Sequence, residues 1–225
     1  MQPLSLKPAL MDQVYEAVLD EIAEGRLAPG TAVAQEDLAE RLGVSRQPVS
    51  HALALLKQQG LVVERGRRGL QVAPIDPDYL RDLYLARAAL DGLAARLAAE
   101  AVRGGRVEAS ALAALEGLIE AGLKAVEGGD LEALMEADAS YHAALNRLSG
   151  NRVIVEITAL QWAHIRRGMR SVLGDPAYRW RAWEEHAQIL QAIRRGDAGL
   201  AAQRAGSHAE LAGEATWRRL RSGGA

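Results

Sequence analysis

Four residues in the second half of the chain have the types and spacing to hold a divalent metal ion. Asp138 precedes His142 by four residues, so both side chains lie on one face of the helix expected over residues 131–148. His186 and His208 fall on two later helices. One carboxylate and three imidazoles, converging from three helices, suit zinc, nickel or manganese and leave open positions for a ligand. An isolated aspartate–histidine pair is also a common surface hydrogen bond, so the spacing leaves both interpretations open.

A second group of residues, in the first third of the chain, has the side chains needed to read DNA. Arginine can pair with guanine through two hydrogen bonds, glutamine can pair with adenine, and serine or neutral histidine can contact bases or phosphates. Arginines on a neighbouring hairpin would meet phosphates or the minor groove. The candidates are Ser45, Arg46, Gln47, Ser50 and His51 on one helix and Arg65, Arg67 and Arg68 on the hairpin.

The helices expected around this second group are short and close together. An apolar stripe predicts a first helix that runs to about Gly25, and a second helix is predicted over residues 35–42. Gly43 is expected to end that helix in the left-handed conformation. Ser45 is expected to cap a third helix with its hydroxyl group, and Gly60 stops this helix.

A basic hairpin is expected to follow the third helix. Residues 61–64 and 70–72 are rich in β-branched side chains and flank a turn of arginines and glycines, a pattern typical of a two-stranded wing. Helix, glycine turn, capped helix and wing form a winged helix-turn-helix, whose second helix lies in the major groove. The alternative is a three-helix protein-interaction domain whose charges are only solvated.

The rest of the chain is predicted to be a mainly helical second domain. A linker at residues 75–78 separates residues 1–75, the expected DNA-binding domain, from residues 76–225, the expected effector-binding and dimerisation domain. Glycine breaks followed by capping aspartates divide the second part into six helices, which short connections favour as an antiparallel bundle. The expected helices cover residues 77–102, 109–127, 131–148, 151–172, 178–195 and 198–220.

Composition excludes several classes of protein. The 225 residues include no cysteine, so disulfides, thiolate nucleophiles and cysteine-based zinc sites are ruled out. No apolar run reaches membrane-spanning length and the N-terminus lacks a signal-peptide pattern, so we expect a cytoplasmic protein with no membrane partner. The net charge of −2 is unevenly distributed, because residues 44–73 contain five basic side chains and one glutamate. This local basic stretch is consistent with phosphate binding.

The first part of the chain resembles the DNA-binding domain of GntR-family bacterial regulators. The resemblance rests on the run PGTAVAQEDLAERLGVSRQPVSHALALLKQQGLVVERGRRGLQV, in which Arg46 and the wing glycines match the family pattern. The family usually carries arginine where this chain has Ser50 and glutamate where it has His51. Glu36 corresponds to an arginine that contacts DNA in one member. The resemblance therefore implies DNA binding, and these departures leave the operator sequence open.

The second part resembles the all-helical effector domain called FCD, found in the FadR branch of the same family. The matching segments are LYLARAALDGLAARLAA, ADASYHAAL, WEEHAQILQAIRRGDAGLA and GSHAEL. The resemblance implies a metal ion held by Asp138, His142, His186 and His208, and the donor types make zinc the first candidate, with nickel or manganese as alternatives. It also implies a small organic-acid effector bound near the metal. Arg87 matches an arginine that could pair with such an anion, and the alternative is an ordinary structural ion pair. His164 is a candidate for the same pocket, and the alternative is a histidine that only packs in the core or lies on the surface.

These observations lead to one favoured function and two alternatives. The favoured one is a homodimeric regulator, expected to be a repressor, that binds operator DNA and responds to a small carboxylate metabolite. The first alternative is a regulator for which the metal ion itself is the signal. The second is a metal-dependent hydrolase, but the chain has no HExxH, no GxSxG and no glycine-rich phosphate loop. We therefore expect no enzymatic activity.

Overall fold

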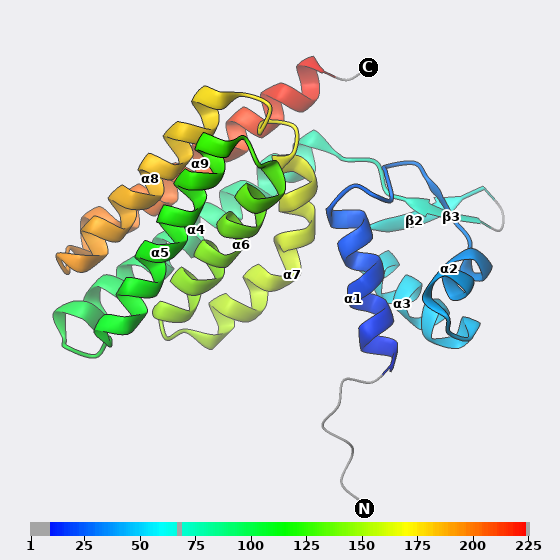
Figure 1. The fold of residues 1–225 in the computed structure, drawn as a ribbon, viewed down its shortest axis with the longest axis horizontal. Helices are drawn as coiled ribbons and strands as arrows, with labels where there is room; N and C mark the ends of the chain where they lie inside the picture. Colours follow the sequence, from blue (N-terminus) through cyan, green and yellow to red (C-terminus); the bar gives the residue numbers. More distant parts are fainter. Residues whose placement is uncertain (1–9, 67–68, 224–225) are drawn as a thin grey trace, which may run out of the picture. The chain divides into compact units, whose positions relative to one another are not determined.

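The computed structural model describes residues 10–66 and 69–223, which form two compact units divided between Ile75 and Asp76 (Figure 1). The first unit combines short helices with a small sheet, whereas residues 76–223 form helices joined by short connections. None of the helices described is both long and apolar enough to cross a membrane.

Three helices build most of the first unit: α1 (Leu10–Ala23), α2 (Gln35–Leu42) and α3 (Arg46–Gln58). Gly43 ends α2 with a φ of 65°, the left-handed conformation predicted for it. This sharp ending lets the chain turn directly into α3. The three helices share a core that contains Val14, Val18, Ile22, Leu38, Val49, Leu53 and Leu56.

The sheet of the first unit has three strands, where the sequence predicted a two-stranded wing. Strands β2 (Val62–Arg65) and β3 (Gly69–Val72) form the expected antiparallel hairpin. Strand β1 (Ala32–Val33) adds to the other side of β3, pairing with Gln71 and Leu70. Two residues are too few to show an alternating pattern, and their partners lie almost forty positions away, so periodicity alone could not reveal this strand.

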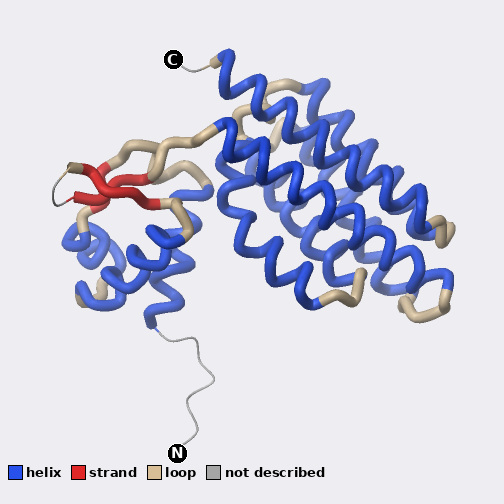
Figure 2. The backbone as a smooth tube through the Cα atoms, turned by 180° about the vertical axis from the view of Figure 1, so that it is seen from behind, coloured by secondary structure: helices blue, strands red, loops and turns tan. Residues whose placement is uncertain are grey.

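Six helices form the described part of the second unit, and Figure 2 shows them running side by side. Their ends lie within three residues of the predicted ones. The aspartates at three of the breaks act as predicted caps, because Asp130, Asp175 and Asp197 each accept a hydrogen bond from a backbone N–H of the following helix. The helices are α4 (Pro77–Arg103), α5 (Ala109–Gly128), α6 (Leu131–Leu148), α7 (Arg152–Met169), α8 (Pro176–Arg194) and α9 (Ala198–Ser222).

Helix α4 is the central helix of the second unit, since it packs against α6, α7, α8 and α9. A glycine permits close packing between α5 and α8. Gly122 of α5 lies directly against the ring of the buried Trp183 on α8, where a Cβ atom would overlap the indole. This packing fixes α8 and, through it, the depth at which α8 side chains enter the bundle.

Candidate functional site

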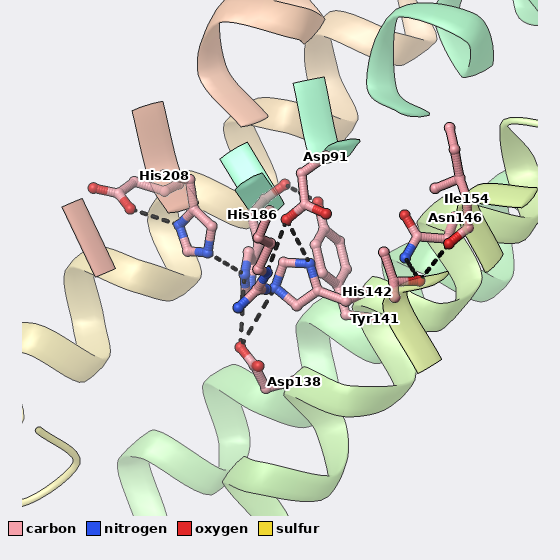
Figure 3. Close-up of polar contacts among 11 residues, drawn as sticks. Asp91, Asp138, Tyr141, His142, Asn146, Ile154, His186 and His208 are labelled. Carbon is pink, nitrogen blue, oxygen red and sulfur yellow. Dashed lines mark hydrogen bonds and ion pairs between the residues drawn. The ribbon is translucent and has the colours of Figure 1, made fainter. Parts of the chain in front are cut away.

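The three histidines predicted as metal ligands meet inside the bundle. His142 comes from α6, His186 from α8 and His208 from α9, and all three are buried. One ring nitrogen from each lies within 4.8 Å of the others, and Figure 3 shows the rings facing one another. Histidines separated by up to 66 positions in the sequence thus form one cluster.

Asp138, the fourth predicted ligand, points at the same place. Its Oδ1 atom lies 3.9 Å from His142 Nε2 and 3.7 Å from His186 Nε2 (Figure 3). The Nε2 atoms of His186 and His208 are 3.1 Å apart. Two neighbouring ligand atoms that each lie about 2.0–2.1 Å from one zinc ion are separated by about 2.8–3.4 Å, depending on whether the coordination is octahedral or tetrahedral. The pair formed by His186 and His208 is already close to this separation, and movements of Asp138 and His142 would complete the set.

The electrostatics of the cluster favour neutral imidazoles at His142 and His186. Burial, with further contributions from the positive charge of Arg87 and from neighbouring histidines, lowers the pKa of His142 and of His186 well below 6.5. Burial raises the pKa of the Asp138 carboxyl, against the attraction of Arg87. Neutral imidazoles keep the lone pair that a metal ligand needs.

Unpartnered nitrogen atoms provide a second sign that the cluster is a metal site. Three buried ring nitrogens have no hydrogen-bond partner among the described residues: Nδ1 and Nε2 of His142, and Nδ1 of His186. Buried polar groups normally have partners, and an absent ion is one explanation when they do not. The residues therefore fit a divalent metal ion by donor type, convergence and unmet bonding capacity.

Aromatic side chains hold His186 in place. The ring of Tyr141 stacks on the imidazole with centroids 4.1 Å apart, and its hydroxyl donates to the backbone carbonyl of His186 over 3.2 Å. The ring of Trp183 lies nearly perpendicular to the same imidazole, with the ring centroids 4.8 Å apart. These contacts restrict the rotamer of His186, which is fully enclosed.

Two carboxylates next to the cluster were not predicted from the sequence as part of the site. Asp91 of α4 lies 3.7 Å from His142 Nδ1 and accepts a hydrogen bond from Arg87 Nε over 3.1 Å. Glu185 of α8 lies 2.7 Å from His208 Nδ1. Asp91 follows Arg87 by one turn within an alanine-rich, otherwise apolar stretch, which was a usable sign of a buried charged pair. Glu185 gave no such sign, because glutamates on helix surfaces are common.

A cavity of about 430 Å³ lies beside the cluster, and both Arg87 and His142 are part of its wall. The guanidinium of Arg87 is buried and stacks 5.3 Å from the ring of Trp162 on α7. The predicted effector residue Arg87 is thus next to a space of ligand size. His164, the other predicted effector residue, is absent from the cavity wall and packs instead against the ring of Tyr79, with the ring centroids 5.3 Å apart.

The DNA-reading candidates on α3 form one exposed face. Arg46, Gln47, Ser50 and His51 are all exposed, whereas the opposite face of α3 is buried in the core. Ser45 occupies the N-cap position, but its hydroxyl makes no capping hydrogen bond, contrary to the prediction. The backbone there is extended as an N-cap requires, so the helix begins at the predicted place without that bond.

An ion pair joins the first residue of α3 to the preceding helix. Arg46 Nη1 lies 2.9 Å from Oε1 of Glu36 on α2, and both side chains are more than half exposed. Glu36, one of the residues that depart from the resembled family pattern, therefore contacts Arg46, which matches that pattern. Arg65 lies exposed at the end of β2, while Arg67 and Arg68 lie outside the described residues.

Comparison with known families identifies both units. The family of bacterial regulatory proteins called gntR matches residues 10–72, and the FCD domain matches residues 82–211. The exposed α3 face lies within the first match. Asp138 and the three clustered histidines lie within the second.

Known proteins show similarity over most of the chain. An uncharacterized HTH-type transcriptional regulator from an unstable DNA locus of Streptomyces ambofaciens is 32% identical over 84% of this chain and 77% of that protein. A probable D-xylose utilization operon transcriptional repressor of Paenarthrobacter nicotinovorans is 28% identical over 87% of this chain and 83% of its own length. The structure of E. coli McbR/YncC superimposes with a TM-score of 0.78 at 23% identity, covering 91% of this chain and 95% of that one. This last similarity concerns the fold.

Proposed function

Since the chain belongs to the GntR family of bacterial regulatory proteins, and is a DNA-binding transcription regulator rather than an enzyme, we propose that it is a repressor controlled by a small organic acid bound beside a divalent metal ion. Two similar proteins carry the name of repressor, the one from Paenarthrobacter nicotinovorans and RspR of E. coli. The operator would be bound in the cytoplasm, where bacterial DNA lies.

The observation that carries this proposal is the set of unpartnered polar atoms around the 430 Å³ cavity. Arg87 Nη2 and Trp162 Nε1 are buried donors, and Asn146 Oδ1 and Gln161 Oε1 are buried acceptors, all without hydrogen-bond partners among the described residues. Leaving each such group unpaired costs about 1–3 kcal/mol. A ligand with a carboxylate for the donors and a hydroxyl or amino group for the acceptors would satisfy all four.

The metal ion would be held by Asp138, His142, His186 and His208. His142 borders both the cluster and the cavity, so an ion bound there would lie close to the cavity wall. Zinc is the first candidate for this mixture of nitrogen and oxygen donors, and nickel or manganese are the alternatives. When bound, the ion would supply positive charge that favours an anionic effector.

We propose that the active form is a homodimer, because helix-turn-helix proteins commonly read two related half-sites with two copies of the recognition helix. Helix α7 offers a surface for such a dimer. Val153, Ile157 and Leu160 lie on one face of α7 and are 56%, 38% and 65% exposed. Leu160→Asp should lower the dimer fraction in analytical ultracentrifugation, and a dimer unaffected by this change would place the interface elsewhere.

An effector can regulate DNA binding only if it binds two conformations of the protein with different affinities. The test is to measure affinity for DNA from the promoter of the encoding gene by fluorescence anisotropy. Zinc-loaded protein would be titrated with mono-, di- and hydroxycarboxylates. At least one acid is expected to change the affinity. If none of the acids does so, the organic-acid proposal is refuted.

Trp162→Phe tests whether such an acid binds in this cavity. The change removes the indole N–H but keeps an aromatic ring beneath Arg87, so the effector should bind more weakly while zinc affinity is unchanged. Trp180→Phe is the matched control, because Trp180 is 43% exposed and is absent from the cavity wall. Equal effector affinities in both variants would remove the cavity as the binding site.

The histidine cluster supports a second candidate, a regulator that responds to the metal ion alone. The two proposals differ in one measurement. If chelation and reloading change operator affinity in the absence of any organic acid, the ion is the signal. If reloading has no effect until an acid is added, the ion only helps to bind the acid.

A further inference from the structure

Two histidines of the cluster have a carboxylate on the side that faces away from the other imidazoles. Figure 3 shows His142 between Asp138 and Asp91, and His208 with a carboxylate on its outer edge. That outer carboxylate belongs to Glu185, whose Oε2 atom lies 2.7 Å from His208 Nδ1. The Oδ2 atom of Asp91 lies 3.7 Å from His142 Nδ1. Neither acid is among the four candidate ligands.

The shorter of these contacts selects one tautomer of its ring. A carboxylate only accepts hydrogen bonds, so a neutral His208 ring beside Glu185 carries its proton on Nδ1 and keeps a lone pair on Nε2. That Nε2 atom faces Nε2 of His186 at 3.1 Å, toward the centre of the cluster. The ring nitrogens of His142 lie 3.7 Å from Asp91 and 3.9 Å from Asp138, too far for a hydrogen bond that would select a tautomer.

We infer that Glu185 is a positioning residue, which orients His208 and fixes the tautomer that presents Nε2 to the metal ion. The inference rests on the metal site included in the proposed function. Carboxylates that accept the outer N–H of a metal-bound histidine raise its basicity and restrict its rotation, and their loss typically lowers metal affinity by about 10–100-fold.

The two carboxylates differ in how safely they can be changed. Asp91 is buried, and the same Oδ2 atom that faces His142 also accepts the hydrogen bond from Arg87, so its removal would strand a buried guanidinium. The side chain of Glu185 is 21% exposed and borders a surface groove of about 260 Å³ between α8 and α9. Glu185 can therefore be shortened without opening the core, which makes it the residue to test.

The experiment compares the full-length protein with three variants. Glu185→Ala removes the acceptor, Glu185→Gln retains a neutral acceptor, and Glu184→Ala changes an exposed glutamate one position away on the same helix. Zinc affinity would be measured by competition with a chromogenic chelator. We expect a loss of about 10–100-fold for Glu185→Ala, a smaller loss for Glu185→Gln and no change for Glu184→Ala.

A second measurement needs no metal. The ¹⁵N chemical shifts of the His208 ring in metal-free protein should report a proton on Nδ1 in the wild type and a shift of population toward the Nε2–H form in Glu185→Ala. Thermal unfolding of the metal-free variants would show whether Glu185 has only a general structural role. Such a role would lower stability while leaving zinc affinity and tautomer unchanged.

The outcomes separate this inference from the proposed function. Wild-type protein that binds none of zinc, nickel and manganese would refute the metal site and the inference together. Wild-type protein that binds zinc as tightly as Glu185→Ala does would refute the inference alone. A His208 ring that carries its proton on Nε2 in the wild type would also overturn it.

Discussion

The proposed DNA-reading surface, formed on α3 by Arg46, Gln47, Ser50 and His51, and the histidine cluster are opposite kinds of site. The first is a set of exposed side chains on one short helix, where the side chain of Arg46 is 69% exposed. The second is enclosed by several helices, and His186 has no exposed surface. Side chains on the DNA-reading surface can be replaced with little effect on folding. The residues of the cluster come together only when the bundle is packed.

The same difference governs the electrostatics. Arg46 and Glu36 are paired in water, where such pairs contribute about 0–1 kcal/mol and DNA phosphates can compete for the arginine. In the cluster, burial shifts the pKa values of His142, His186 and Asp138. Substitutions at the surface should therefore change operator affinity modestly and in a salt-dependent way. Substitutions in the cluster should change zinc affinity strongly.

The largest expected effect is the loss of a ligand from the cluster. His208→Ala should lower zinc affinity by more than the about 10–100-fold expected for an outer carboxylate, because a direct donor is removed. Metal content after chelation and reloading would measure it. His51→Ala, in the other unit, should retain full metal content, and full occupancy in His208→Ala would exclude this histidine from the ligand set.

Metal removal should affect the two units unequally. At a free zinc concentration 100 times the dissociation constant, binding stabilises the folded form by about 2.7 kcal/mol. Hydrogen exchange measured with and without a chelator should show protection lost in α6, α8 and α9 but retained in α1 and α3. A similar change in both units would contradict the assignment of the metal to the bundle, and His208→Ala should not respond to the chelator.

On the DNA-reading surface, Arg46→Ala should weaken operator binding by about 1–3 kcal/mol and relax selectivity at one base pair. Zinc affinity should not change. Anisotropy titrations against operator variants would measure both effects. Arg96→Ala on α4 is the control, because Arg96 is an exposed arginine with a similar ion pair, to Glu100. Unchanged binding by Arg46→Ala on a footprinted site would refute the assignment of α3 as the reading helix.

The smallest expected effect comes from the partner of Arg46. Glu36→Gln removes a surface ion pair and a negative charge near the DNA, so operator affinity should rise a few fold, equivalent to about 1 kcal/mol or less. Glu40→Gln, one turn later on α2, removes the same charge without this pair. An equal gain in both variants would show that only net charge matters and that the Arg46–Glu36 contact has no role in DNA binding.

The sequence was most informative where the determining interactions are local. Gly43 could be expected to end α2, and the capping aspartates to begin α6, α8 and α9, because both depend on a few neighbouring residues. The capping bond expected from Ser45 is not formed, although the residue type and helix start agree. Strand β1 was not predicted, because its pairing with β3 is not local.

By itself, the sequence determined the order of the helices and of the β2–β3 hairpin, the exposed face of α3 and the placement of Asp138 and His142 on one side of α6. A helix places residues four apart on one face wherever it lies. Only the tertiary structure brought His186 and His208 to that face, set Asp91 and Glu185 behind the rings, placed Arg87 on a cavity wall and left His164 away from it. Distances between helices depend on how side chains such as Trp183 pack against Gly122, and no spacing within one helix encodes them.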